Sequence, residues 1–159
     1  MILDTKLIMA WEQAITSASA ASAANTTTTP PAAGIIDLGL AARDVGVGTN
    51  KLYWCVLVTA DMTDSGSNST ITPSLRTSAT ESASALTGSP ATIITGQAFP
   101  ALTKAGTLQI NVLPPGAYLE YLDTYLTLAG GTLDTGKFSS WICTDVPQMS
   151  YYASGFNPN

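Results

Sequence analysis

The sequence predicts an all-β protein built as a jelly-roll-like, two-sheet sandwich with an extended N-terminal arm and a C-terminal tail. Segments rich in β-branched and aromatic residues recur along the chain and are separated by Gly, Pro, Asp and Asn. Apolar positions almost nowhere keep a helical period for three turns. A length of 159 residues also suits one domain with a single hydrophobic core.

The N-terminal region, residues 1–33, separates into two parts. Residues 1–13 are amphipathic, whereas residues 14–33 form an uncharged, low-complexity Ala/Ser/Thr stretch that cannot build a core and is expected to be a loop or tether. The β-sandwich body is expected at residues 34–146. Residues 147–159 form a tail with aromatic side chains among Pro, Gly, Ser and Asn, and such aromatics usually dock on another surface.

Strands are expected wherever β-branched and aromatic residues cluster between turn residues. With the segment near Leu7 they number about eight, which is enough for two sheets. The segments of the body are 34–39, 51–59, 70–78, 91–97, 107–113, 118–128 and 137–146.

Two of these strands allow predictions about their faces. Residues 52–58 are apolar throughout, so we expect a central strand with the core on one side and a further cover, such as a partner, on the other. In the strand at 107–113, Leu108, Ile110 and Val112 alternate with polar residues. This alternation predicts that the three apolar side chains face the core and that the intervening polar side chains face water.

The segment 118–128 is open to two interpretations. Leu119, Leu122 and Leu126 would share one face of a helix. A strand is favoured because turn residues flank the segment and because its Tyr and Thr content suits a pleated surface.

The charge content limits the functions that the chain can have. Charged residues make up 11% of the chain against about 25% in a typical protein, so a free monomer would expose a weakly charged surface of hydroxyl and methyl groups. We therefore expect a homo-oligomer or a subunit of a larger assembly. The net charge is −5 and the basic residues are scattered singly, which argues against nucleic acid and anionic membranes as partners.

No segment has the properties of an export signal or a membrane-spanning helix. The apolar run near the N-terminus is too short for a signal peptide, and the longest fully apolar run, residues 52–58, is too short to cross a bilayer. The chain is therefore expected to be made and used in a cytoplasm.

The residues that commonly carry catalysis are sparse. The chain contains no histidine, so the commonest general base and metal ligand is missing. Glu120 and Asp123 are the best carboxylate pair, but on a strand their odd spacing sends them to opposite faces. Residues 61–68 resemble part of a calcium loop, yet Thr72 stands where a bidentate Glu is needed, so a solvated hairpin loop is favoured over a weak cation site. We therefore expect a non-enzymatic protein without catalytic residues, cofactor or metal.

The cysteines and most of the tryptophans fall in predicted strands. Cys55 and Cys143 are expected to be buried, reduced thiols, with a disulfide as the alternative. Trp54 and Trp141 are expected in the core, whereas Trp11 lies in the N-terminal arm. Because exposed aromatic residues can stack on sugars, a carbohydrate-binding β-sandwich module, adhesin-like in function, is the rival interpretation.

Several motifs along the chain follow one another as they do in a known family. They are Ile2-Leu3-Asp4 with Leu7, Gln13-Ala14 with Thr16, Ile36-Asp37-Leu38-Gly39, Arg43-Asp44-Val45-Gly46-Val47-Gly48, Leu52-Tyr53, Leu113-Pro114-Pro115-Gly116 with Tyr118-Leu119, and Tyr152-Ala153-Ser154-Gly155-Phe156. With these motifs the chain resembles the Bordetella-phage type of capsid cement, or decoration, protein of tailed bacteriophages. The stretch 18–33 departs from the family, because it is longer than the short Ala/Ser linker expected there.

The resemblance implies a jelly-roll-like virion protein that binds the outer surface of a tailed-phage head and bridges neighbouring major capsid subunits. Its partners would be the major capsid protein and further copies of itself, as a homodimer or homotrimer, and it would be assembled in the bacterial host cytoplasm. Aromatic anchors dominate interface energies, so the terminal arms are the predicted contacts. The predicted interface residues are Met1, Ile2, Leu3, Leu7, Ile8, Trp11, Tyr151, Tyr152 and Phe156.

Overall fold

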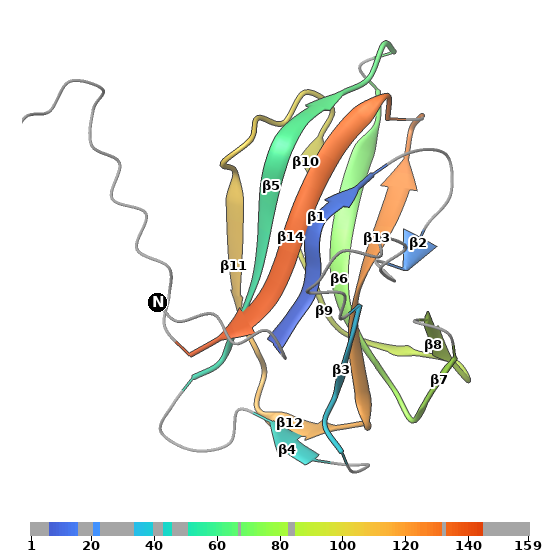
Figure 1. Ribbon diagram of the computed structural model, residues 1–159, viewed down its shortest axis with the longest axis vertical. Helices are drawn as coiled ribbons and strands as arrows, with labels where there is room; N and C mark the ends of the chain where they lie inside the picture. Colours follow the sequence, from blue (N-terminus) through green and yellow to red (C-terminus); the bar gives the residue numbers. More distant parts are fainter. Residues whose placement is uncertain are drawn as a thin grey trace, which may run out of the picture.

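The computed structural model describes residues 7–15, 21–22, 34–39, 43–45, 51–66, 68–82, 85–131 and 133–144. Within these ranges the regular structure is β-strand, arranged mainly as two antiparallel sheets that pack together (Figure 1). In this described part, no helix has the length and apolar character needed to cross a membrane. The prediction of an all-β, two-sheet sandwich is confirmed.

The first sheet, called sheet A, has four strands in the order β1-β14-β5-β11, and Figure 1 shows them side by side. All neighbours in it are antiparallel, and β1 and β11 are its edge strands. Its strands are Ile8–Ala14 (β1), Thr135–Cys143 (β14), Tyr53–Thr63 (β5) and Leu108–Val112 (β11).

The second sheet, called sheet B, is centred on the long strands β6 and β13. Its path is β10-β6-β13-β2, and in addition β9 pairs with β6 and β3 pairs with β13. Its strands are Phe99–Pro100 (β10), Thr70–Ser78 (β6), Tyr121–Ala129 (β13), Ala21–Ser22 (β2), Ala91–Thr95 (β9) and Ile35–Asp37 (β3). Two short pairs complete the described strands: Arg43–Val45 (β4) with Gly116–Tyr118 (β12), and Thr80–Ser82 (β7) with Ala85–Thr87 (β8).

Among the connections between the two sheets, the one after β5 and the one after β13 lie together at one end of the sandwich. Because β5 pairs with β14 in sheet A and β6 pairs with β13 in sheet B, the two crossings are nested, which gives the sandwich its jelly-roll-like character. Gly130 in the second crossing has a φ of +83°, and a Cβ there would lie 2.2 Å from the main-chain oxygen of Asn68 in the first. Only glycine allows this approach of the two loops.

The link after β5 was expected to be a hairpin loop, and that expectation is wrong. Both edges of β5 are already occupied by β14 and β11, so β6 cannot pair with it and joins the opposite sheet. The Asp64 carboxylate closes the link, because it accepts hydrogen bonds from the main-chain N–H groups of Gly66, Asn68 and Ser69 at 2.8, 3.0 and 2.7 Å. The hydroxyl of Ser69 also donates to it, at 2.5 Å.

The main core lies between the inner faces of the two sheets. Its largest side chain is Trp54, which is 0% exposed and whose Nε1–H donates to Thr124 Oγ1 of sheet B (3.1 Å) and to Ser140 Oγ of sheet A (2.9 Å). The two hydroxyls also bond each other at 2.7 Å, and Thr124 Oγ1 lies 3.5 Å from the sulfur of Met9. Every polar side-chain atom of this network therefore has a hydrogen-bond partner. The buried apolar residues around the network include Val56, Val58, Ile71, Leu75, Leu122, Leu126, Phe138 and Ile142.

The strand interpretation of the ambiguous segment 118–128 is confirmed, since β13 covers Tyr121–Ala129. Leu122, Thr124 and Leu126 are buried with a period of two and face the core, which a helix does not produce.

Residues 8–14 of the predicted N-terminal arm form a strand of the sandwich. β1 pairs with β14 from Ile8 opposite Trp141 to Ala14 opposite Lys137. Met9 and Ala10 are buried in the main core. The sequence does not reveal this pairing, because the low-complexity stretch separates β1 from the other strands along the chain, and its partner β14 lies more than 100 residues away.

Candidate interaction surface

Sheet A carries a second apolar surface on the face that points away from sheet B. The cross-strand register places Ile110 and Trp141 on either side of Cys55, Leu108 beside Leu57, and Val112 beside Tyr53. Residues that share a face of adjacent strands contact one another, and here they form a cluster separate from the main core. We call this surface the outer patch: Ile8, Tyr53, Cys55, Leu57, Leu108, Ile110, Val112, Trp141 and Cys143.

The outer patch exists because β5 is apolar at successive positions. Side chains alternate between faces, so Trp54, Val56 and Val58 enter the main core while the residues between them enter the outer patch. The prediction that residues 52–58 are apolar toward both faces is confirmed. In the described part of the chain no strand lies over this outer face, and the prediction that a partner covers it stays a prediction.

The predicted orientation of the strand at 107–113 is wrong. Ile110 and Val112 are 37% and 49% exposed, because the register with β5 places them on the outer face. The inner position is taken by Gln109, which accepts a hydrogen bond from the main-chain N–H of Gln97 (3.0 Å) and donates to its oxygen (2.5 Å). The polar side of β11 thus faces the interior and binds the segment between β9 and β10, whereas Ile110 and Val112 on its apolar side are exposed to solvent.

A buried polar atom of the outer patch has no hydrogen-bond partner. The side chain of Trp141 is 5% exposed, yet its Nε1–H is unpaired, and the hydroxyl of Thr59 on β5 is likewise buried and unpaired. An unsatisfied buried donor costs about 1–3 kcal/mol. An acceptor brought by a partner, such as a main-chain carbonyl, would remove that cost for the indole N–H, which can only donate.

Two thiols lie beneath the exposed part of the patch. The Sγ atoms of Cys55 and Cys143 are 3.6 Å apart, and both residues are buried and free. The prediction of two buried, reduced thiols agrees with this arrangement. Burial raises the pKa of the Cys55 thiol, and the neighbouring Cys143 thiol raises it further. The Cys55 side chain therefore behaves as a small hydrophobic group rather than as a nucleophile.

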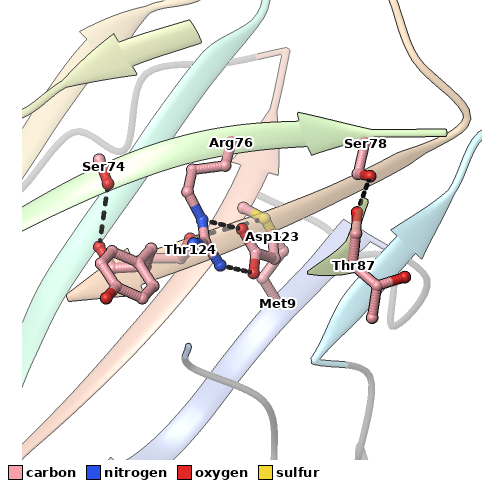
Figure 2. Close-up of polar contacts among 8 residues, drawn as sticks. Met9, Ser74, Arg76, Ser78, Thr87, Asp123 and Thr124 are labelled. Carbon is pink, nitrogen blue, oxygen red and sulfur yellow. Dashed lines mark hydrogen bonds and ion pairs between the residues drawn. The ribbon is translucent and has the colours of Figure 1, made fainter. Parts of the chain in front are cut away.

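The carboxylate that sequence analysis singled out on β13 has a structural partner. Asp123 is buried, and its oxygens accept from Nε (3.0 Å) and Nη2 (2.6 Å) of Arg76 on the neighbouring strand β6, as Figure 2 shows. The guanidinium also lies 3.8 Å over the ring of Tyr125. This bidentate contact with Arg76 gives the Asp123 carboxylate a role in holding the two strands together. No contact between Glu120 and Asp123 is found among the described residues.

The aspartates of the calcium-like segment also bind protein groups. The hydrogen bonds from Ser69, then those from Gly66 and Asn68, lower the pKa of Asp64 to about 2. Asp61 accepts from Nζ of Lys104 and from the main-chain N–H of Ala105, both at 2.8 Å. In the described residues no group of three or more potential metal ligands is present.

The predicted interface residues fall in three classes. Trp11 is 49% exposed on β1. Leu7 packs partly buried against the main core, and Ile8 is 3% exposed within the outer patch. The other predicted residues lie outside the described part of the chain: Met1, Ile2, Leu3, Tyr151, Tyr152 and Phe156. Sequence analysis foresaw the part of the outer patch that β5 supplies, but it assigned Trp141 and the apolar side chains of β11 to the core.

Comparison with protein-family models places the chain in a known family. The model of the Bbp16 family matches residues 9–142, from the second residue of β1 to the last but one of β14, and so spans both sheets and all of the outer patch except Ile8 and Cys143. No curated protein matches the chain.

Proposed function

The chain belongs to the Bbp16 family, a Bordetella phage protein family, and on this premise we propose that it is a capsid cement protein. In this role it binds the outer surface of a tailed-phage head and bridges neighbouring major capsid subunits, without catalysing a reaction. The observation that carries the proposal is the outer patch, an uncharged apolar face with half-exposed side chains and an unpaired indole N–H.

The chemistry of the outer patch suits a protein partner. Interface cores are depleted of charge and enriched in aromatic residues, and the patch contains Tyr53 and Trp141 but no charged side chain. A partner strand or loop that lies across sheet A would bury Ile110 and Val112 and offer a carbonyl to Trp141. Burial of apolar area contributes about 25 cal/mol per Å² before the costs of association.

Repetition strengthens such modest contacts on a capsid. Each copy adds a small apolar contact across a seam between subunits, and many copies act together on one shell, so the summed effect on head stability is large. This proposal places the protein on the virion, with the major capsid protein as its partner.

The test compares head binding by two charge-introducing variants. Tyr53→Glu places a charge within the outer patch, while Leu102→Glu places one outside it, at an apolar side chain that is 54% exposed in the link between β10 and β11. With heads stripped of the protein, we expect wild type and Leu102→Glu to bind in a copy number comparable to the major capsid protein. Tyr53→Glu should bind at least about tenfold more weakly, as for loss of an interface anchor.

Two results would contradict the proposal. One is a head that keeps its heat resistance after this protein is removed. The other is equal binding by Tyr53→Glu and wild type when both are folded by circular dichroism. A glycan-array signal from a protein that does not bind heads would instead favour the carbohydrate-binding function.

A further inference from the structure

The edge strand β11 presents unpaired main-chain groups in a regular order. At its ends the N–H of Leu113 donates to the Leu52 oxygen (2.9 Å), and the N–H of Val58 donates to the Thr107 oxygen (2.9 Å). In an antiparallel ladder, residues that bond the neighbouring strand alternate with residues that do not. The odd-numbered residues thus bond to β5, and Leu108, Ile110 and Val112 direct their N–H and C=O groups to the open side.

The two edges of sheet A differ in how they avoid pairing with other chains. Proteins usually protect exposed edges with bulges, charges or proline. β1 has register shifts on both sides of Ala10, and Glu12 has a φ of +46°. β11 keeps an unbroken register from Leu108 to Val112, holds no proline, and lies in an uncharged segment from residue 105 to residue 119. Figure 1 shows no described strand beyond it.

We propose that β11 pairs antiparallel with β11 of a second copy of this chain, about a two-fold axis centred on Ile110. In that register Ile110 faces its own symmetry mate, and Leu108 faces Val112 in both directions. Each residue of these pairs directs its N–H and C=O groups outward, so every donor of one copy faces an acceptor of the other. Two identical strands can therefore pair with each other. Because the segment is uncharged, no like charges meet near the axis.

The same axis has a consequence for the outer patch. A two-fold axis that makes two strands antiparallel within one continuous sheet is perpendicular to that sheet, so the same face of each copy points to the same side. The four strands of sheet A in each copy then form one continuous sheet of twice that number, with two outer patches on one face. If the proposed capsid role holds, such a dimer offers two identical contacts to neighbouring capsid subunits, which is the geometry that bridging requires.

The experiment measures the association of the full chain by sedimentation velocity over a wide concentration range. Ile110→Pro removes an N–H that points to the open side, which an edge strand tolerates. Ile110→Glu brings two charges together at the axis. We expect wild type and Leu102→Glu to be dimers. In both Ile110 variants the dissociation constant of the dimer should be at least about tenfold larger than in wild type, which corresponds to a loss of about 1.4 kcal/mol or more in the free energy of association.

Hydrogen exchange locates the contact independently of the variants. The amides of Leu108, Ile110 and Val112 should exchange slowly in the dimer and fast in the Ile110→Pro monomer, apart from the proline itself. A monomer or trimer as the wild-type species, or a dimer in which these amides exchange fast, would overturn the proposal. Head binding is measured separately, so a dimer that fails to bind heads contradicts only the capsid role, and a head-binding monomer contradicts only the β11 contact.

Discussion

The two tryptophans at the centre of sheet A have opposite environments. Trp54 on β5 faces the main core and donates its indole N–H to two hydroxyls, whereas Trp141 on β14 faces the outer patch and donates to none. Both side chains are almost fully buried, so exposure alone does not distinguish them. The difference shows that the hydrogen bonds around Trp54 are complete within the chain, whereas the outer patch holds a buried donor without an acceptor, as expected for a surface that a partner completes.

The sharpest test of this difference replaces each indole by a phenyl ring. Trp54→Phe leaves a cavity and removes a donor that serves Thr124 and Ser140, so we expect a loss of about 2–4 kcal/mol in the free energy of unfolding. Trp141→Phe also loses packing, but it removes a buried donor that has no partner in the isolated chain, and removing that donor is favourable. The free energy of unfolding should therefore change by less than about 1 kcal/mol. Urea unfolding of both variants measures the two values.

Equal losses in the two variants would remove the distinction between the faces. The head-binding assay adds a second contrast, because Trp141→Phe should weaken head binding if the indole N–H reaches an acceptor there. Trp54→Phe, where it remains folded, should bind heads as wild type does, since its side chain lies within the sandwich.

The sequence revealed the strands of sheet A but not which face of the edge strand is buried. Alternation in β11 shows that Leu108, Ile110 and Val112 share a face, and it carries no information about which side that face takes. The answer depends on the register with β5, whose residues are apolar toward both sides. The unpaired Trp141 could not be predicted at all, because it depends on the distance from one donor to acceptors far away in sequence.

A smaller effect is expected from the thiol under the outer patch. Cys55→Ala removes one buried sulfur and should lower the free energy of unfolding by about 1 kcal/mol. Cys55→Ser should cost about 1–2 kcal/mol more than Cys55→Ala, because a hydroxyl is placed among apolar groups. Thermal unfolding of the two variants gives the difference. A serine variant as stable as the alanine variant would mean that water reaches this position and that the patch is open down to β5.

The outer patch should respond little to acid, in contrast to the crossing after β5. The pKa of Asp64 is about 2 in the folded chain, below the ordinary value of 3.8, because Ser69, Gly66 and Asn68 donate to the carboxylate. A lowered pKa contributes stability that is present above about pH 4 and is lost as the pH falls through about 2. The stability of wild type relative to Asp64→Asn should therefore decline between these pH values. A difference that stays constant across that range would show that the loop does not bind the charged carboxylate.

The smallest effect on stability is expected at Trp11, the predicted anchor that the structure leaves exposed. Because Trp11 is 49% exposed on a bulged edge strand, Trp11→Ala should change the free energy of unfolding by less than about 0.5 kcal/mol, and chemical denaturation measures this change.

If the proposed function holds and Trp11 extends the contact beyond the outer patch, the same variant should bind stripped heads about tenfold more weakly, since interface tryptophans are frequent anchors. Trp11→Tyr is the matched control, because it keeps an aromatic ring at the same position and should retain most of the affinity. Unchanged head binding by Trp11→Ala, together with weak binding by Tyr53→Glu, would confine the contact to the outer patch. The core around Trp54 and the outer patch would then account for the stability and the adhesion of the chain separately.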